Sequence, residues 1–235
     1  MTPERIPRWE SELWSLISSG DGEHCPLYDE CQIRRQGGQC LDDSKEYFHN
    51  INALMDNDKF VLNDPESGKP EFIRCARAGR IFQLVGKLAE KYLKMGKVYS
   101  PPVPEMLIAL CDKNHPIEIR EVPLKVYHGA IWRLKESWIV HLNGNDTPAR
   151  RRFSLFHEAF HILAHSKATP VFRKVGVKKG SFNELLADHF AGCVLMPQEW
   201  AREKWAEVQD LNKMAEIFQI PKPVVWFGLN GMGLI

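Results

Sequence analysis

The sequence has no excess of charge of either sign. Its 235 residues include 31 lysines and arginines against 30 aspartates and glutamates, which leaves a formal net charge of +1. Proteins that attract nucleic acid or anionic membranes by their overall field carry a clear positive excess. The balance therefore argues against direct nucleic-acid binding and against a membrane partner, although a local basic patch would not show in the total.

Long hydrophobic runs are also missing. No apolar stretch approaches the roughly 20 residues of a membrane-spanning helix. The opening MTPERIPRWESELWSLISSG has scattered charges instead of the apolar centre of a secretory signal. We therefore expect a soluble, cytoplasmic protein, in which the six cysteines are thiols or metal ligands and not disulfides.

Hydrophobic periodicity divides the chain near residue 75. Residues 116–143 alternate in IEIREV and LKVY, and AIWRLKESWIVHL predicts a hairpin around Lys135 and Glu136. Most of the remaining chain has helical spacing or helix-starting prolines. We predict an α+β fold with a small, mostly antiparallel sheet packed against helices. Residues 1–75 would form a cysteine-containing N-terminal extension, and residues 76–235 the main domain.

Two histidines and a glutamate interrupt an apolar helix in RRFSLFHEAFHILAHS, residues 151–166. Burying three ionisable groups is costly unless something pairs with them. His157 and His161 are four residues apart and share one face of a helix, while Glu158 lies about 100° around from His157. In zinc hydrolases with this H-E-x-x-H arrangement, the histidines bind the metal and the glutamate acts on the attacking water. The alternative is a helix with hydrogen-bonded core histidines.

A second apolar helix, NELLADHFAGCVLMP, carries Glu184 and Asp188 one turn apart. Catalytic zinc normally has three protein ligands, and Glu184 can be the third. Asp188 can bond the other nitrogen of a ligand histidine and fix its tautomer. The alternative, a solvent-exposed acidic face, is disfavoured by the nearby H-E-x-x-H motif.

These motifs resemble the ImmA/IrrE-type zinc metallopeptidases, which belong to the gluzincins. The resemblance rests on RRFSLFHEAFHILAH, ELLADHFAGCVLMP and the preceding WIVHLN, with similar flanking segments, and covers roughly residues 78–235. It implies a zincin-like domain with one catalytic Zn²⁺, with Glu158 as general base. The implied zinc ligands are His157, His161 and Glu184.

The resemblance also implies features of the cleft. Phe160 stands where family members usually have glycine, so we expect the cleft to depart from the family there. In zincins an edge strand beside the active-site helix pairs with an extended peptide, which implies that Ile139, His141 and Asn143 or their alternate neighbours line the cleft. The intermediate also needs an oxyanion donor, for which the candidates are His189, His128, Tyr127 and His141.

By the same resemblance the protein substrate would be a helix–turn–helix repressor, cleaved in transcription regulation. The leading interpretation is a zinc-dependent endopeptidase. One alternative is a non-catalytic metal-binding regulatory or interaction protein with the same fold, which would not need Glu158. Another is a binding module whose cysteine segment recognises a partner. The closing LNKMAEIFQIPKPVVWFGLNG has a helix–turn–helix rhythm but few groups that read bases, so we interpret it as core packing.

Three cysteines of the predicted extension lie within 16 positions: Cys25, Cys31 and Cys40. Closely spaced thiolates in a turn-rich segment suit a second, structural metal. His49, His24 or Cys75 could be the fourth ligand, and an iron–sulfur cluster is the less favoured alternative. Because the spacing matches no common zinc-finger pattern, three unrelated thiols are an equal alternative.

Overall fold

The α+β class is confirmed by the computed structural model, which describes residues 6–19, 76–125, 127–165, 167 and 182–235. The predicted cysteine site lies outside these residues, including Cys25, Cys31, Cys40, His49 and the alternatives His24 and Cys75. The elements before the central helices are α1 Arg8–Ser18, α4 Ala76–Met95, the 3₁₀-helix η1 Glu105–Leu110, β1 Ile117–Val122, β2 Gly129–Arg133 and β3 Trp138–Asn143. The helices that follow are α5 Pro148–His165, α6 Phe182–Leu195, α7 Gln198–Val208, α8 Leu211–Phe218 and α9 Lys222–Gly231.

The three-stranded sheet has the order β1-β3-β2, with β3 antiparallel to β2 and parallel to β1. The predicted hairpin is confirmed, and its turn is closed by the Leu134 N–H, which donates to the Ser137 carbonyl at 2.9 Å. The sheet is mixed instead of mostly antiparallel. The described residues of LKVY form no strand, and the connection from β1 leads to the far side of β3. The most apolar strand, β3, is therefore central.

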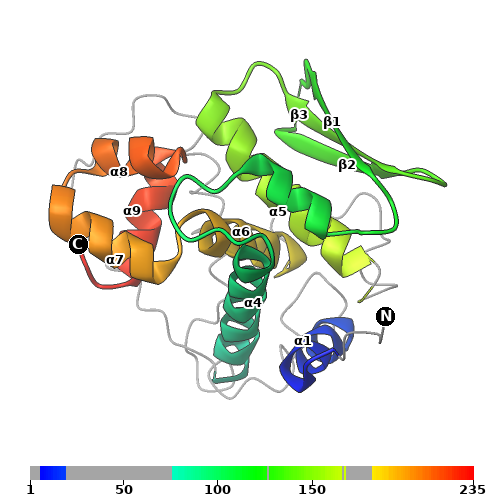
Figure 1. Ribbon diagram of the computed structural model, residues 1–235, viewed down its shortest axis with the longest axis horizontal. Coiled ribbons are helices and arrows are strands. Elements are labelled where there is room, and N and C mark those ends of the chain that lie inside the picture. The colour runs from blue at the N-terminus through cyan, green and yellow to red at the C-terminus, as the bar shows by residue number, and fades with distance from the viewer. Residues whose placement is uncertain (1–5, 20–75, 126, 166, 168–181) are drawn as a thin grey trace, which may run out of the picture.

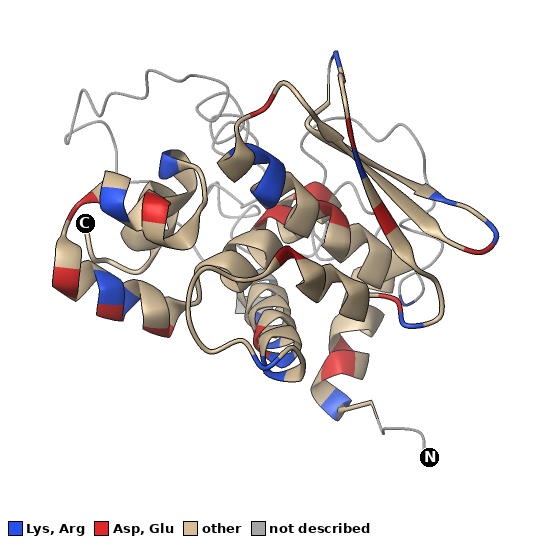
Figure 2. Cartoon of the chain, turned by 45° about the horizontal axis from the view of Figure 1, so that its top comes forward, with Lys and Arg blue, Asp and Glu red and all other residues tan. Residues whose placement is uncertain are grey.

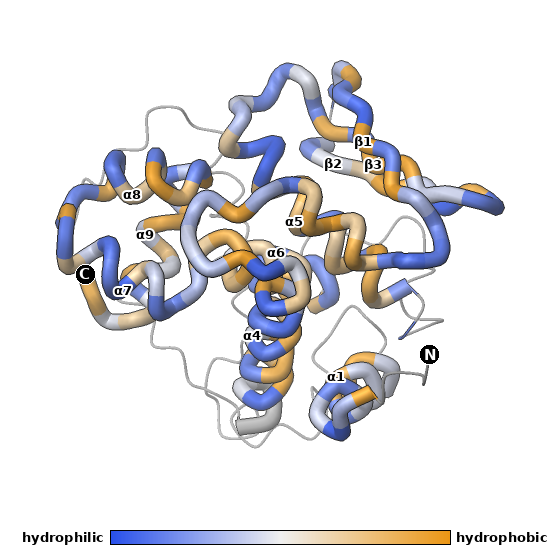
Figure 3. The backbone as a smooth tube through the Cα atoms, in the orientation of Figure 1, coloured by the Kyte–Doolittle hydropathy of each residue, from blue (hydrophilic) through white to orange (hydrophobic). Residues whose placement is uncertain are grey.

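Helix α5 covers one face of this sheet, and α6 packs against α5 (Figure 1). Alternate side chains of β3 are buried towards this core, as expected from the period of a strand: Trp138, Val140 and Leu142. Helix α4 packs against α6. Hydrophobic residues of α4, α5 and α6 gather where these helices meet (Figure 3).

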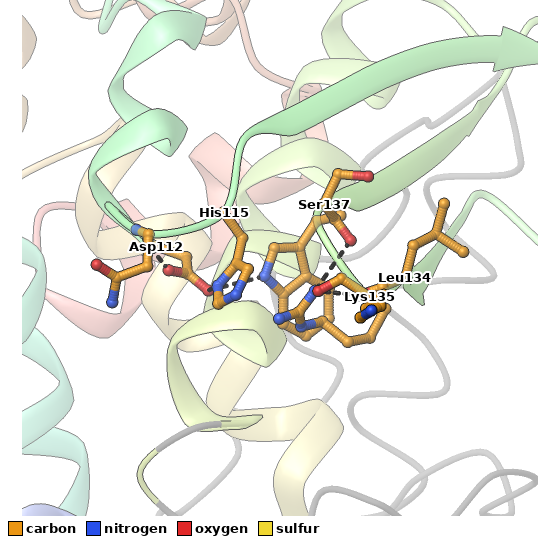
Figure 4. Close-up of polar contacts among 8 residues, drawn as sticks. Asp112, His115, Leu134, Lys135 and Ser137 are labelled. Carbon is orange, nitrogen blue, oxygen red and sulfur yellow. Dashed lines mark hydrogen bonds and ion pairs between the residues drawn. The ribbon is translucent and has the colours of Figure 1, made fainter.

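The start of β3 is held by a polar cluster beside the hairpin. The Trp138 Nε1–H donates to Asp112 Oδ2 at 3.0 Å, and His115 Nδ1 lies 2.9 Å from the same oxygen (Figure 4). His165, the last residue of α5, packs edge-on to the Trp138 ring with centroids 5.0 Å apart. The Arg133 guanidinium lies over the Trp138 ring, 5.2 Å from its centroid. It also donates to three carbonyls of the turn, those of Leu134, Lys135 and Ser137. These contacts fix the hairpin to α5.

Helix α1 belongs to the predicted extension, yet it packs against α4. Two ion pairs join the helices, Glu10 to Lys91 at 2.7 Å and Glu12 to Arg80 at 2.9 Å. Its buried face contributes to the common core through Leu13, Trp14 and Ile17. The division of the chain at residue 75 stays a prediction.

The surface agrees with the charge balance of the sequence. Basic and acidic residues are interspersed along α4 and α7 (Figure 2). Within the described part of the chain, no helix combines the length and apolar character needed to cross a membrane.

Candidate metal centre

Helix α5 begins at a proline after a capping threonine. Thr147 Oγ1 accepts from the Arg150 N–H at 3.2 Å, and Pro148 at the first helical position loses no hydrogen bond by lacking an N–H. From this start the helix runs for 18 residues without a break. His157 and His161 thus lie on one face, with ring centroids 5.0 Å apart.

The neighbouring helix brings a carboxylate to the two imidazoles. Glu184 lies in the first turn of α6, where the helix dipole favours a negative charge. Its Oε2 is 3.2 Å from His157 Nε2, and its Oε1 is 3.3 Å from His161 Nε2. The two Nε2 atoms are 3.2 Å apart. One donor atom from each of the three residues thus falls within a single group less than 4.8 Å across.

This donor set fits a metal ion such as zinc. In a tetrahedral site with metal–ligand bonds of about 2.0–2.1 Å, ligand atoms are about 3.3 Å apart. The separation of 3.2 Å between the two Nε2 atoms agrees with that value. Glu184 places one carboxylate oxygen 3.2 Å from the first of these nitrogens and its other oxygen 3.3 Å from the second. Two imidazole nitrogens and a carboxylate are also the ligand types that zinc hydrolases use.

Asp188 determines which nitrogen of His157 faces this group. Its Oδ1 lies 2.7 Å from His157 Nδ1. A proton on Nδ1 then donates to Asp188, and the lone pair of Nε2 points towards Glu184 and His161. Asp188 is one helical turn beyond Glu184 on α6, so one helix supplies both the carboxylate of the group and the carboxylate that orients its histidine.

Electrostatic coupling within the group is strong. Burial opposes protonation of His157, but the charges of Asp188 and Glu184 outweigh it and raise the pKa of His157 well above its usual value. Burial likewise opposes ionisation of Glu184, but His161 and His157 lower the pKa of Glu184 to about 2. The site is therefore built for a carboxylate next to positive charge.

Glu158 lies beside the metal-binding group without belonging to it. It is 9% exposed, and burial raises the pKa of Glu158 against the effect of His157 and His161. It lies against the first residue of β2, where an added Cβ on Gly129 would be 2.7 Å from Glu158 Oε1. Sequence reasoning missed Gly129, because a single glycine at the start of a strand carries no chemical signal.

The substrate strand predicted from the sequence is corrected by the sheet order. Ile139, His141 and Asn143 belong to β3, whose backbone is paired on both sides by β1 and β2. A peptide cannot pair with a central strand. The strand that reaches Glu158 is β2, which lies at an edge of the sheet among the described strands.

Three of the four oxyanion candidates have structural contacts. His189 Nε2 lies 3.1 Å from the Phe82 carbonyl on α4, and burial lowers the pKa of His189 to about 4, so it is a neutral packing residue. His128 Nδ1 lies 2.8 Å from Asp146, and His141 packs against Trp132 on the sheet. Tyr127 is 64% exposed, in the connection between β1 and β2.

The fold and the site together define a class of protein: an α+β domain in which two packed helices bring together three residues that could hold a metal ion, beside a sheet edge. The family model of the IrrE N-terminal-like domain, peptidase M78, matches residues 112–229, half of the chain. The chain belongs to this family of metallopeptidases, as the resemblance in its motifs predicted. It matches no curated protein sequence.

Asp188→Asn is expected to weaken zinc binding roughly 10–100-fold, the usual cost of losing an outer-shell partner of a ligand. A proton competes with the metal for His157 below the raised pKa of that residue. The substitution removes the charge that raises this pKa, so proton competition decreases in the variant. The difference in zinc affinity should therefore be largest at alkaline pH, above the raised pKa of His157, and become smaller as the pH falls through that pKa. Chelator competition at several pH values measures it, and a constant ratio would contradict the coupling.

Proposed function

We propose that the protein is a zinc-dependent endopeptidase in which His157, His161 and Glu184 bind the zinc. The observation that carries the proposal is the position of Glu158. It is a buried carboxylate beside the metal-binding group and outside it, and it lies against the edge strand β2. A site that only stored or sensed a metal would not need a buried carboxylate there in addition to Glu184, because burying one is costly.

The chemistry follows from these residues. When bound, zinc acidifies a water molecule and polarises the scissile carbonyl. Glu158 takes the proton from the attacking water and delivers it to the leaving amine. The raised pKa of Glu158, which is due mainly to burial, makes it a stronger base than an exposed glutamate. Asp188 keeps His157 in the tautomer that leaves Nε2 available.

The substrate would bind as an added strand on β2. The His128 carbonyl accepts from the Asn143 N–H, and the Leu134 N–H donates to the Ser137 carbonyl. Because hydrogen bonding alternates along an antiparallel pair, the N–H and C=O groups of Gly129, Ile131 and Arg133 point away from β3. An extended peptide can pair with these groups, which would bring its backbone alongside Glu158.

We further propose a regulatory role in the cytoplasm, with a helix–turn–helix transcriptional repressor as substrate. The support for this substrate class is the resemblance of the motifs to the ImmA/IrrE-type peptidases. The competing function is metal-dependent binding of a partner without cleavage.

The test offers purified helix–turn–helix repressors from the same genome to the zinc-loaded protein. Cleavage is expected with wild-type protein, is lost after chelation and returns with added zinc. Glu158→Gln serves as the catalytic control. Equal cleavage by both proteins, or stable binding without cleavage by either, would overturn the peptidase proposal.

A further inference from the structure

We propose that Gly129 is a positioning residue for Glu158, so that the first residue of β2 fixes where the general base lies. The inference rests on the proposed function and concerns a residue that does not itself touch the metal-binding group. An ideal Cβ on Gly129 would be 2.7 Å from Glu158 Oε1, 3.1 Å from its Cγ and 3.3 Å from its Cδ. All three of its nearest neighbours thus belong to one side chain.

The backbone does not explain the glycine. A positive φ is the usual reason for glycine at a turn or a strand end. Gly233 is the only glycine with a positive φ in the described part of the chain, so Gly129 has a conformation that alanine also adopts. What glycine provides at this position is space, and Glu158 occupies it.

Gly129 is held in place by the pairing of β2 with β3 and by the contacts of its neighbour His128. The Nδ1 atom of the preceding residue, His128, lies 2.8 Å from Asp146 Oδ2. The His128 carbonyl accepts from the Asn143 N–H at 2.9 Å. Gly129 itself pairs with Leu142 in the register of β2 and β3. The strand therefore cannot withdraw easily, and a Cβ on Gly129 must displace the carboxylate.

Glu158 has little room to move without losing its function. It is 9% exposed, and its helix packs against β2 and β3 on one side and α6 on the other. Rotation away from Gly129 changes the position of Oε1 relative to His157 and His161, next to which the attacking water must lie. Alanine at 129 should thus disturb proton transfer while the three metal ligands keep their positions.

The experiment uses zinc-loaded full-length protein and acetohydroxamate as the probe. This ligand chelates the metal, and its ionisable proton is taken up by a carboxylate beside the metal. Gly129→Ala is compared with Glu158→Gln, with the double variant and with Gly144→Ala. Gly144 lies directly after β3 in the same sheet, and a Cβ there meets nothing closer than 3.8 Å.

Gly129→Ala is expected to keep one zinc per chain and to bind acetohydroxamate roughly tenfold or more weakly, the scale of one charge-assisted hydrogen bond. Adding it to Glu158→Gln should cause no further loss, and Gly144→Ala should behave as wild type. With a cleavable substrate, kcat should fall and KM should change little. Wild-type affinity in Gly129→Ala, or an equal loss in the Glu158→Gln background, would overturn the inference.

Two outcomes separate this inference from the proposed function. The proposed site itself is wrong if the wild-type protein binds no zinc. It is also wrong if wild type and Glu158→Gln bind acetohydroxamate with equal affinity. If Gly129→Ala does not fold, the variant Gly129→Ala with Glu158→Asp decides, because the shorter side chain removes the steric overlap. Recovery of folding in that double variant supports the contact, and failure to recover contradicts it.

Discussion

Glu158→Gln and Glu184→Gln are expected to abolish peptide cleavage in different ways. Each variant replaces a glutamate by a glutamine of nearly the same shape, so each removes one negative charge from the same site. Glu158→Gln should keep about one zinc per chain and lose roughly 10²–10⁴-fold in kcat, the contribution of a positioned general base. Glu184→Gln should lose the zinc itself, with an affinity at least roughly 100-fold weaker, above the range for outer-shell partners.

The reason lies in the contacts of the two carboxylates. Glu184 is 3.2–3.3 Å from both imidazole Nε2 atoms, and those histidines lower the pKa of Glu184 to about 2 against the effect of burial. A neutral amide cannot replace this charge beside a cation. Glu158 is outside the ligand group, so its amide leaves His157, His161 and Glu184 unchanged.

Metal analysis after dialysis and single-turnover cleavage together distinguish the two results. Thermal unfolding with and without zinc provides an independent measure, because a ligand bound only to the native state raises Tm. Zinc should stabilise wild type and Glu158→Gln alike and have little effect on Glu184→Gln. If Glu158→Gln loses the metal instead, Glu158 is a ligand and the assignment of roles is wrong.

The helix periodicities of the sequence predicted that His157, His161 and Glu184 would come together, and the structure brings these three side chains close to one another. His157 and His161 share a face at a spacing of four, and Glu184 and Asp188 repeat that spacing on α6. Such contacts depend on local helix geometry and on the cost of burying charge. What remained open was how α5 and α6 meet, which the structure answers with ligand separations of 3.2–3.3 Å.

The sheet was harder to predict, for a physical reason. Alternation gives the two faces of a strand but neither its neighbours nor its direction. The prediction therefore gave the substrate role to the whole hairpin but took its named cleft residues from β3, which is central, and not from β2, for which we propose that role. Gly129 could not be identified either, because the contact that requires glycine joins residues 29 positions apart in sequence.

Phe160 shows how a large residue at an unusual position can be accommodated in the core. The resemblance predicted a changed cleft at this residue, since family members usually have glycine at this position before the second histidine. In the structure its side chain is fully buried and points into the core, where its ring lies 6.2 Å from Trp14 and 5.5 Å from Phe190. Helix α1 supplies Trp14, so the large residue fills the junction of α1, α5 and α6.

Phe160→Ala is therefore expected to destabilise the protein by about 3–5 kcal/mol, the usual cost of removing a buried aromatic ring and leaving a cavity. For a chain of this length the fall in Tm should be on the order of 10 °C. Thermal unfolding should be measured in the presence of a chelator, so that bound metal does not mask the change in Tm. Tyr99→Ala is the matched control, because Tyr99 is 73% exposed and its ring contributes little to the core.

Phe160→Ala also distinguishes a role of this residue in core stability from a role in the metal site. At a temperature where Phe160→Ala is folded, zinc affinity and kcat should stay within a few-fold of wild type. The ring packs into the core against Trp14 of α1 and Phe190 of α6, and it meets the His161 ring only edge-on, with centroids 6.4 Å apart. Phe160→Leu, which restores most of the volume, should recover part of the stability. An unchanged Tm together with weaker zinc binding would show that Phe160 acts on the proposed metal site, as the departure from the glycine usual in the family predicted.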